Sequence, residues 1–122
     1  MKWVGVGPKL FSARVDLYAP DHDGRWVSLV ADALHRRLPF TDDGERALVG
    51  VDQGRGHEGS PVVGLTFLLR ASDFGGAAQL AVETATAAGA DAGIGGRVYD
   101  VVLVPEDALV LPERERNIPM PD

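Results

Sequence analysis

The stretch from Ser60 to Val104 constrains the fold of this chain more than any other part of the sequence, because it contains the longest apolar runs. Apolar residues recur at every second position along 62–70 and again along 97–104, and this period is typical of a strand with a buried face. Between these runs, small apolar residues recur at helical spacing from Ser72 to Gly89. The stretch therefore predicts a strand, a helix and a second strand.

The first half of the chain repeats this order of elements. Residues 11–18 alternate, residues 25–38 carry apolar side chains at helical spacing before Pro39, and residues 45–52 alternate again. A glycine-rich loop at 53–59 then joins two strand-like runs, which predicts a hairpin. The predicted order of elements is β-α-β-β-α-β.

This order predicts an α+β fold, specifically a ferredoxin-like β-α-β-β-α-β sandwich. Right-handed crossovers place each later strand two positions from its predecessor, which gives a four-stranded antiparallel sheet of order 4-1-3-2 with two helices on one face. We expect a single α+β domain over residues 11–104, an N-terminal segment over 1–10 and an extended C-terminal tail over 105–122.

The face of this sheet without helices should be polar if it meets water. The alternating pattern instead assigns many apolar side chains to it, with Val98 facing away from the helices and Tyr99 facing toward them. A large exposed apolar patch often marks an interface, and two-fold pairing is the commonest way for identical chains to cover one. We therefore expect a homodimer whose interface contains Tyr18, Val62, Thr66, Leu68, Val102 and Val104. The alternative is that the N-terminal segment or the tail from Leu109 covers this face within one chain.

The net charge of −6 disfavours nucleic acid as a partner, since binding to phosphates needs a basic surface. The chain contains no cysteine, which excludes disulfides, thiolate metal sites and cysteine nucleophiles. No apolar run approaches the ~20 residues of a membrane helix, and Met1 to Lys9 lack the apolar core of a signal peptide. We expect a cytoplasmic protein without a cofactor, a bound metal or a membrane partner.

The densest polar cluster in the sequence is Asp21-His22-Asp23, directly before the first predicted helix. Two carboxylates and an imidazole could bind a divalent cation, although no further acid follows at the spacing of a calcium loop. Arg14 on the first strand and His57 in the hairpin loop complete a candidate polar site. The competing interpretation is structural: an aspartate caps the helix, and the histidines lie in water.

Ser72, Gly75 and Gly76 form a candidate anion site at the start of the second predicted helix. Free backbone N–H groups at a helix N-terminus attract phosphates and carboxylates, and the glycines permit close approach. The sequence lacks the Lys-Ser/Thr of a P-loop here, so an ordinary turn with Ser72 as the N-cap is the competing interpretation.

No motif in the sequence specifies a chemistry, and no catalytic residue is predicted. The first hypothesis is a small non-catalytic interaction or regulatory module that acts as a homo-oligomer or binds another protein. The alternative is a small-molecule enzyme or ligand sensor of the dimeric ferredoxin-like type. A weaker alternative is an acidic protein that occupies a nucleic-acid-binding partner. An enclosed pocket on the order of a few hundred Å³ would favour the enzyme or sensor, and a filled interior would favour the module.

Overall fold

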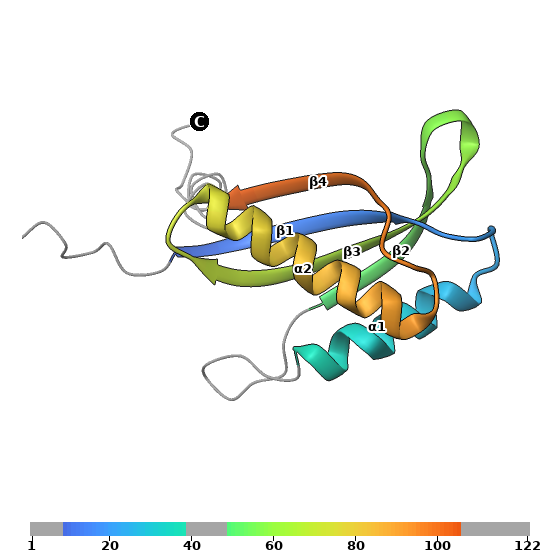
Figure 1. Cartoon of the computed structure of the whole chain (residues 1–122), viewed down its shortest axis with the longest axis horizontal. Coiled ribbons are helices and arrows are strands. Elements are labelled where there is room, and N and C mark those ends of the chain that lie inside the picture. Colours follow the sequence, from blue (N-terminus) through green and yellow to red (C-terminus); the bar gives the residue numbers. More distant parts are fainter. Residues whose placement is uncertain (1–8, 39–48, 106–122) are drawn as a thin grey trace, which may run out of the picture.

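The computed structural model describes residues 9–38 and 49–105, and Figure 1 shows their arrangement. The elements are β1 (Lys9–Tyr18), α1 (Arg25–Arg37), β2 (Val49–Arg55), the short 3-10 helix η1 (His57–Gly59), β3 (Pro61–Ala71), α2 (Phe74–Ala92) and β4 (Val98–Pro105). The predicted order of strands and helices is confirmed, although β1 begins at Lys9, inside the predicted N-terminal segment. The predictions for residues 1–8, for the part of the expected strand over 45–48 and for the tail beyond Pro105 lie outside the described residues.

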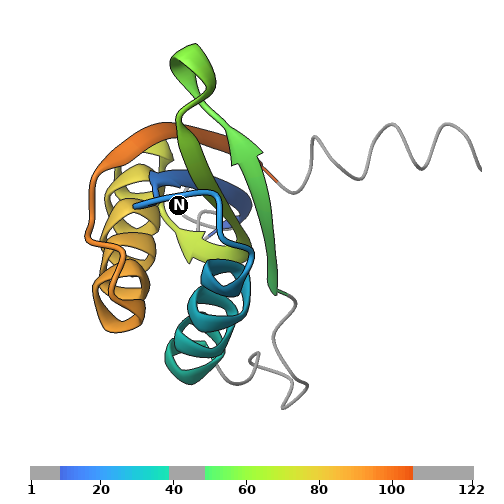
Figure 2. The same cartoon turned by 90° about the vertical axis from the view of Figure 1, so that its right-hand side faces the viewer.

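The four strands form one antiparallel sheet with the order β2-β3-β1-β4, which is the predicted order 4-1-3-2 read in reverse. The crossover through α1 leaves a position beside β1 that β3 fills, and the crossover through α2 brings β4 to the other side of β1. Both helices lie on the same face of the sheet (Figure 2). The predicted α+β fold with four antiparallel strands and two helices is therefore confirmed. Neither helix in the described residues is long and apolar enough to span a membrane.

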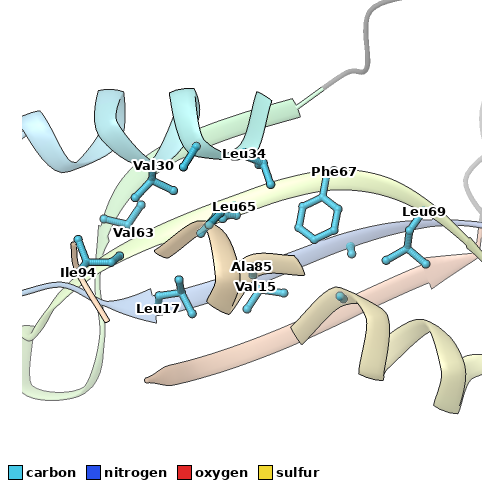
Figure 3. Close-up of a cluster of buried hydrophobic side chains, with 14 of the residues drawn as sticks. Val15, Leu17, Val30, Leu34, Val63, Leu65, Phe67, Leu69, Ala85 and Ile94 are labelled. Atoms are coloured by element: carbon cyan, nitrogen blue, oxygen red, sulfur yellow. The ribbon is translucent and has the colours of Figure 1, made fainter. Parts of the chain in front are cut away.

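The hydrophobic core lies between the sheet and the two helices (Figure 3). Alternate residues of the two central strands point into it, and all of them are buried: Phe11, Ala13, Val15, Leu17, Val63, Leu65, Phe67 and Leu69. α1 adds Val30 and Leu34, whereas the buried side chains of α2 are all alanines: Ala77, Ala81, Ala85 and Ala88. Because these side chains are a single methyl group, α2 can pack close to the sheet.

Both ends of α2 differ from the prediction. Its N-cap is Asp73 rather than Ser72, and the Asp73 carboxylate accepts a hydrogen bond from the N–H of Gly76 at 2.7 Å. Its C-cap is Gly93 rather than Gly89, with a φ of 92°, a left-handed conformation that glycine adopts without strain. Gly89 instead lies buried inside the helix, because the alanines that follow it continue the helical turns.

A bulge in β4 reverses two of the predicted side-chain orientations. The pairing of β4 with β1 shifts between Asp16 and Leu17, so Tyr99 is an extra residue without a partner on β1. Val98 packs against the core, whereas Tyr99 lies on the opposite face with its ring centre 5.5 Å from that of Tyr18. The prediction that Val98 faces away from the helices and Tyr99 toward them is wrong, because strict alternation has no place for an extra residue.

Candidate functional site

The face of the sheet opposite the helices, here called the open face, carries the side chains that can form a site outside the core. The antiparallel register arranges them in rows that run across the strands. From one end to the other, these rows contain Leu10 and Arg70; Val104, Ser12 and Leu68; Val102, Arg14, Thr66 and Gly50; Asp100, Asp16, Gly64 and Asp52; and Tyr18, Val62 and Gly54. Residues that are distant in the sequence are therefore neighbours on this face.

Three carboxylates, those of Asp100, Asp16 and Asp52, lie in one row of the open face, here called the acid row. Arg14 reaches into the acid row from the neighbouring row. Its Nη1 and Nη2 donate hydrogen bonds to the two carboxylate oxygens of Asp52 at 2.9 and 2.8 Å, and its Nε lies 3.1 Å from Oδ1 of Asp16. A two-pronged contact of this kind is among the strongest that a guanidinium and a carboxylate can form.

Gly64 of β3 makes this contact possible. It pairs with Asp16 on one side and with Asp52 on the other, and the Arg14 guanidinium lies over its backbone. A β-carbon at position 64 would lie 2.6 Å from Oδ1 of Asp16 and would overlap the guanidinium. The missing side chain therefore allows a salt bridge between β1 and β2, which are not neighbours in the sheet.

The acid row carries more negative charge than Arg14 neutralises. The hydrogen bonds from Arg14 lower the pKa of Asp52 below its usual value. The pKa of Asp16 is raised instead, because burial penalises its charged form, although Arg14 acts in the opposite direction. The hydrogen bonds to Asp52 also raise the pKa of Arg14 above its usual range, so the guanidinium stays charged. Three carboxylates beside one guanidinium leave this part of the open face acidic.

The two rows next to the acid row, here called the apolar rows, carry the apolar side chains of Val102, Val104 and Leu68 together with Arg14, Ser12 and Thr66. Val102 is 47% exposed, and Leu68 and Val104 are half-buried on either side of Ser12. A shallow depression of about 200 Å³ is lined by Ser12, Val49, Gly50, Thr66, Phe67 and Leu68. Because it is open to solvent, this depression resembles a surface groove rather than an enclosed active site.

The opposite end of the open face is aromatic. The rings of Tyr18 and Tyr99 meet edge to face, and the guanidinium carbon of Arg97 lies 4.7 Å from the centre of the Tyr18 ring. Val62 is only 4% exposed, so this predicted interface residue offers no surface to a partner. The other predicted interface residues are accessible: Val102 is exposed, and Tyr18, Thr66, Leu68 and Val104 are half-buried.

The residues of the predicted polar site fall into three separate groups, the first of which is the turn before α1. Oδ1 of Asp21 accepts hydrogen bonds from the backbone N–H of Asp23 at 3.0 Å and from Nε1 of Trp26 at 2.7 Å. These bonds lower the pKa of Asp21. The side-chain amide of Gln53 donates to the carbonyl of His22 at 2.5 Å, which ties this turn to β2. The contacts of the turn are those of a structural element.

The second group is Arg14 with the acid row, and the third is His57 at the hairpin tip, whose Nε2 lies 3.5 Å from the carboxylate of Glu58. Asp23, in the first group, accepts the N–H of Arg25 at 3.0 Å. In residues 9–38 and 49–105, no three or more His, Asp and Glu side chains are grouped so as to hold a metal ion. These contacts hold the five residues of the predicted polar site in three separate groups.

The candidate anion site at Ser72, Gly75 and Gly76 contains a carboxylate of the protein itself. Asp73 accepts the N–H of Gly76 and lies at the N-terminus of α2, where the helix dipole favours a negative charge. A second anion at this position would be repelled by the Asp73 carboxylate. The local geometry is that of an ordinary capped helix.

The sequence pattern places the acid row on the open face but does not predict the salt bridge from Arg14 to Asp52. These residues lie 38 positions apart, and only the register of three strands brings them together. The sequence contains one indication of this contact, because a glycine inside a strand, here Gly64, often marks the close approach of another group.

No family model matches the chain, and no curated protein is significantly similar to it. The structure defines the chain as an α+β domain with one face of its sheet covered by helices and an open face opposite them. The chemistry of that open face is therefore the basis for a functional proposal.

Proposed function

We propose that this chain is a small non-catalytic interaction module of the ferredoxin-like type, and that it self-associates through the open face. The observation that carries the proposal is that Val102 is exposed, and Leu68 and Val104 are half-buried, on a face that no helix covers in the described residues. Apolar side chains in this position are removed from water when two such faces pack together. The strand order and the shared side of the helices support the ferredoxin-like assignment.

The acid row supports an interface of defined orientation. Arg14 is held by Asp52 and Asp16, so it presents a preformed geometry to a partner surface. Charged groups beside an apolar patch favour one orientation, because opposed like charges cost free energy. In a two-fold pairing the acid rows of the two copies must therefore lie apart, with the axis nearer to the apolar rows.

The interior favours a binding module over an enzyme. The core is filled with apolar side chains, and the described part of the chain has no buried polar residue. The depression beside Ser12 and Thr66 is shallow. The competing hypothesis of a small-molecule enzyme or ligand sensor requires an enclosed pocket with convergent polar groups.

The molar mass of the assembly at micromolar concentration, measured by light scattering or sedimentation, tests this proposal. Leu68→Lys places a charge within the apolar rows, and we expect it to halve the molar mass of the wild-type assembly. Leu29→Lys is the matched control, because Leu29 is 42% exposed and lies on α1, on the helix side of the molecule. We expect this control to leave the molar mass unchanged. A monomeric wild-type chain, or equal effects of the two substitutions, would contradict the proposal.

A further inference from the structure

The two edges of the sheet differ in their protection against pairing with another strand. β2 and β4 are the edge strands, each with one neighbour among the described strands. β2 contains two glycines together with Asp52 and Arg55, and breaks in the pattern and charges are common means of preventing edge-to-edge pairing. β4 reads Val-Tyr-Asp-Val-Val-Leu-Val-Pro, and Asp100 is its only charged residue. β4 is therefore the less protected edge.

The backbone hydrogen-bonding groups of β4 alternate between β1 and the outside of the sheet. The N–H of Val101 donates to the carboxylate of Asp100 at 2.9 Å. This N–H therefore points away from β1, and by the period of two the N–H and C=O of Leu103 point in the same direction. Val101 and Leu103 form the outer edge of the sheet, and the Asp100 carboxylate covers one of its donors.

We propose that two copies of this chain join through their β4 edges as an antiparallel pair, with the two-fold axis at Val102. The regular part of β4 extends from Asp100 to Val104, since the bulge at Tyr99 interrupts one end and Pro105, which has no N–H, follows the other. Val102 is the midpoint of this segment and is 47% exposed. The pairing extends the sheet across both copies.

This register suits the backbone and the side chains of β4. Val101 exchanges both backbone hydrogen bonds with Leu103 of the second copy, and the two-fold axis repeats the exchange. Val102 lies opposite Val102 of the second copy. Asp100 lies opposite Val104 of the second copy, so the two carboxylates stay apart.

The neighbouring registers suit β4 less well. A register centred on Val101 pairs Tyr99, which lies on the open face, with Leu103 of the second copy, which packs on the core side. A register centred on Leu103 brings Pro105 into the pairing, and proline cannot donate to a ladder. The segment is thus self-complementary about Val102, which identifies a second copy of this chain as the occupant of the edge.

The Asp100 carboxylate and the second copy compete for the N–H of Val101 at the outer edge of β4. The carboxylate must release the N–H of Val101 before a strand of the second copy can accept that hydrogen bond. We expect Asp100→Ala to lower the dissociation constant of the edge-paired dimer by about threefold to tenfold, because the competing hydrogen bond is lost. An unchanged or higher dissociation constant would contradict this role.

The inference rests on the proposed function in one respect, since both take the partner to be a second copy of this chain. The test uses the full chain carrying Leu68→Lys, which disables pairing through the open face. Because the natural chain has no cysteine, Val102→Cys or Val104→Cys then introduces a single thiol. Cα atoms of opposed, non-hydrogen-bonded residues lie about 4.5 Å apart, within reach of a disulfide, whereas two copies of residue 104 would be about 13 Å apart.

Under mild oxidation, we expect the Val102→Cys protein to form a disulfide-linked dimer at least about tenfold faster than the Val104→Cys protein. Both positions lie on the same strand and the same face, and because Val102 is exposed and Val104 half-buried, each rate is divided by the rate at which the same thiol reacts with a small disulfide reagent. Equal rates, or no linked dimer from Val102→Cys, would overturn the edge pairing. If Val102→Cys links the copies while Leu68→Lys alone leaves the molar mass unchanged, the edge pairing holds and pairing through the open face fails.

Amide hydrogen exchange provides a second readout without any substitution in β4. In the edge-paired dimer, the N–H of Leu103 is hydrogen-bonded to the second copy, so its exchange should slow as the protein concentration rises through the dissociation constant. The N–H of Val102 points toward β1 and is the internal control, because its protection comes from the chain's own sheet. A Leu103 exchange rate that does not change with concentration would also overturn the proposal.

Discussion

Among individual residues, Gly64 affects the open face most, because it lets Arg14 cross β3 to Asp52. Gly64→Ala would displace the guanidinium, whereas an added β-carbon at Gly50 would have its nearest neighbour, Cβ of Thr66, at 3.9 Å. Both substitutions reduce the entropy of the unfolded chain by the same amount, so Gly50→Ala is the control. We expect Gly64→Ala to be less stable than Gly50→Ala by about 1–2 kcal/mol in urea unfolding. Equal stabilities would show that the contact across β3 does not stabilise the fold.

The lowered pKa of Asp52 predicts the direction in which the stability of the fold changes with pH. Hydrogen bonds from Arg14 lower this pKa, so the contribution of Asp52 to stability is present above its usual pKa of 3.8 and is lost as the pH falls through the lowered pKa. Asp52→Asn should reduce the free energy of unfolding at pH 7 by at most about 1 kcal/mol, since the side chain is 56% exposed and solvent screens the pair. Urea unfolding should show this difference shrinking as the pH falls below 3.8 and disappearing below the lowered pKa.

Asp16→Asn is the comparison for that experiment. Burial raises the pKa of Asp16, so its charged form destabilises the folded state above the raised pKa, and this cost disappears as the pH falls through it. We therefore expect Asp16→Asn to be better tolerated than Asp52→Asn at pH 7. The reverse order would mean that the ion pair with Arg14 outweighs the burial of Asp16.

Among the helices and strands, the C-terminus of α2 depends on a single backbone conformation. Gly93 has a φ of 92°, and a side chain in this left-handed region costs about 1–2 kcal/mol, so Gly93→Ala should lower the free energy of unfolding by that amount. Gly75→Ala is the control, because Gly75 lies in the exposed first turn of α2 and an added β-carbon meets only Oδ1 of Asp73, at 3.7 Å. Gly75→Ala should be neutral or stabilising by up to about 1 kcal/mol in thermal or urea unfolding. A destabilised Gly75→Ala would contradict this account of the helix.

The sequence predicts the elements around the core better than their ends and the contacts on the open face. Alternation along 62–70 locates β3 because burial imposes that period on a strand. The C-terminus of α2 and the bulge at Tyr99 depend on single residues that leave no trace in a periodic pattern. The salt bridge from Arg14 to Asp52 is harder to predict from the sequence, because it depends on the register of β1, β3 and β2. Register follows from the packing of the whole sheet.

For the molecule as a whole, the open face and the β4 edge point in different directions, so both can be occupied at once. Pairing through the open face stacks two sheets, and pairing through β4 extends each sheet sideways. An assembly that uses both surfaces contains four chains when the two two-fold axes meet at right angles, because only then does it close. In that case Leu68→Lys leaves an edge-paired dimer, which agrees with the halved molar mass expected for this variant.

The extra residue at position 99 also determines which changes of chain length this domain tolerates. Val98 points to the helices and Asp100 to the open face, as they would in a strand without the extra residue. A gene that loses the codon for Tyr99 would therefore still encode a β4 with every remaining side chain on its present side. The loss of the codon for Asp100 would do the same, because Tyr99 and Asp100 lie on the same face, whereas the loss of one codon from 101–103 would place at least one neighbouring side chain on the wrong face of the sheet.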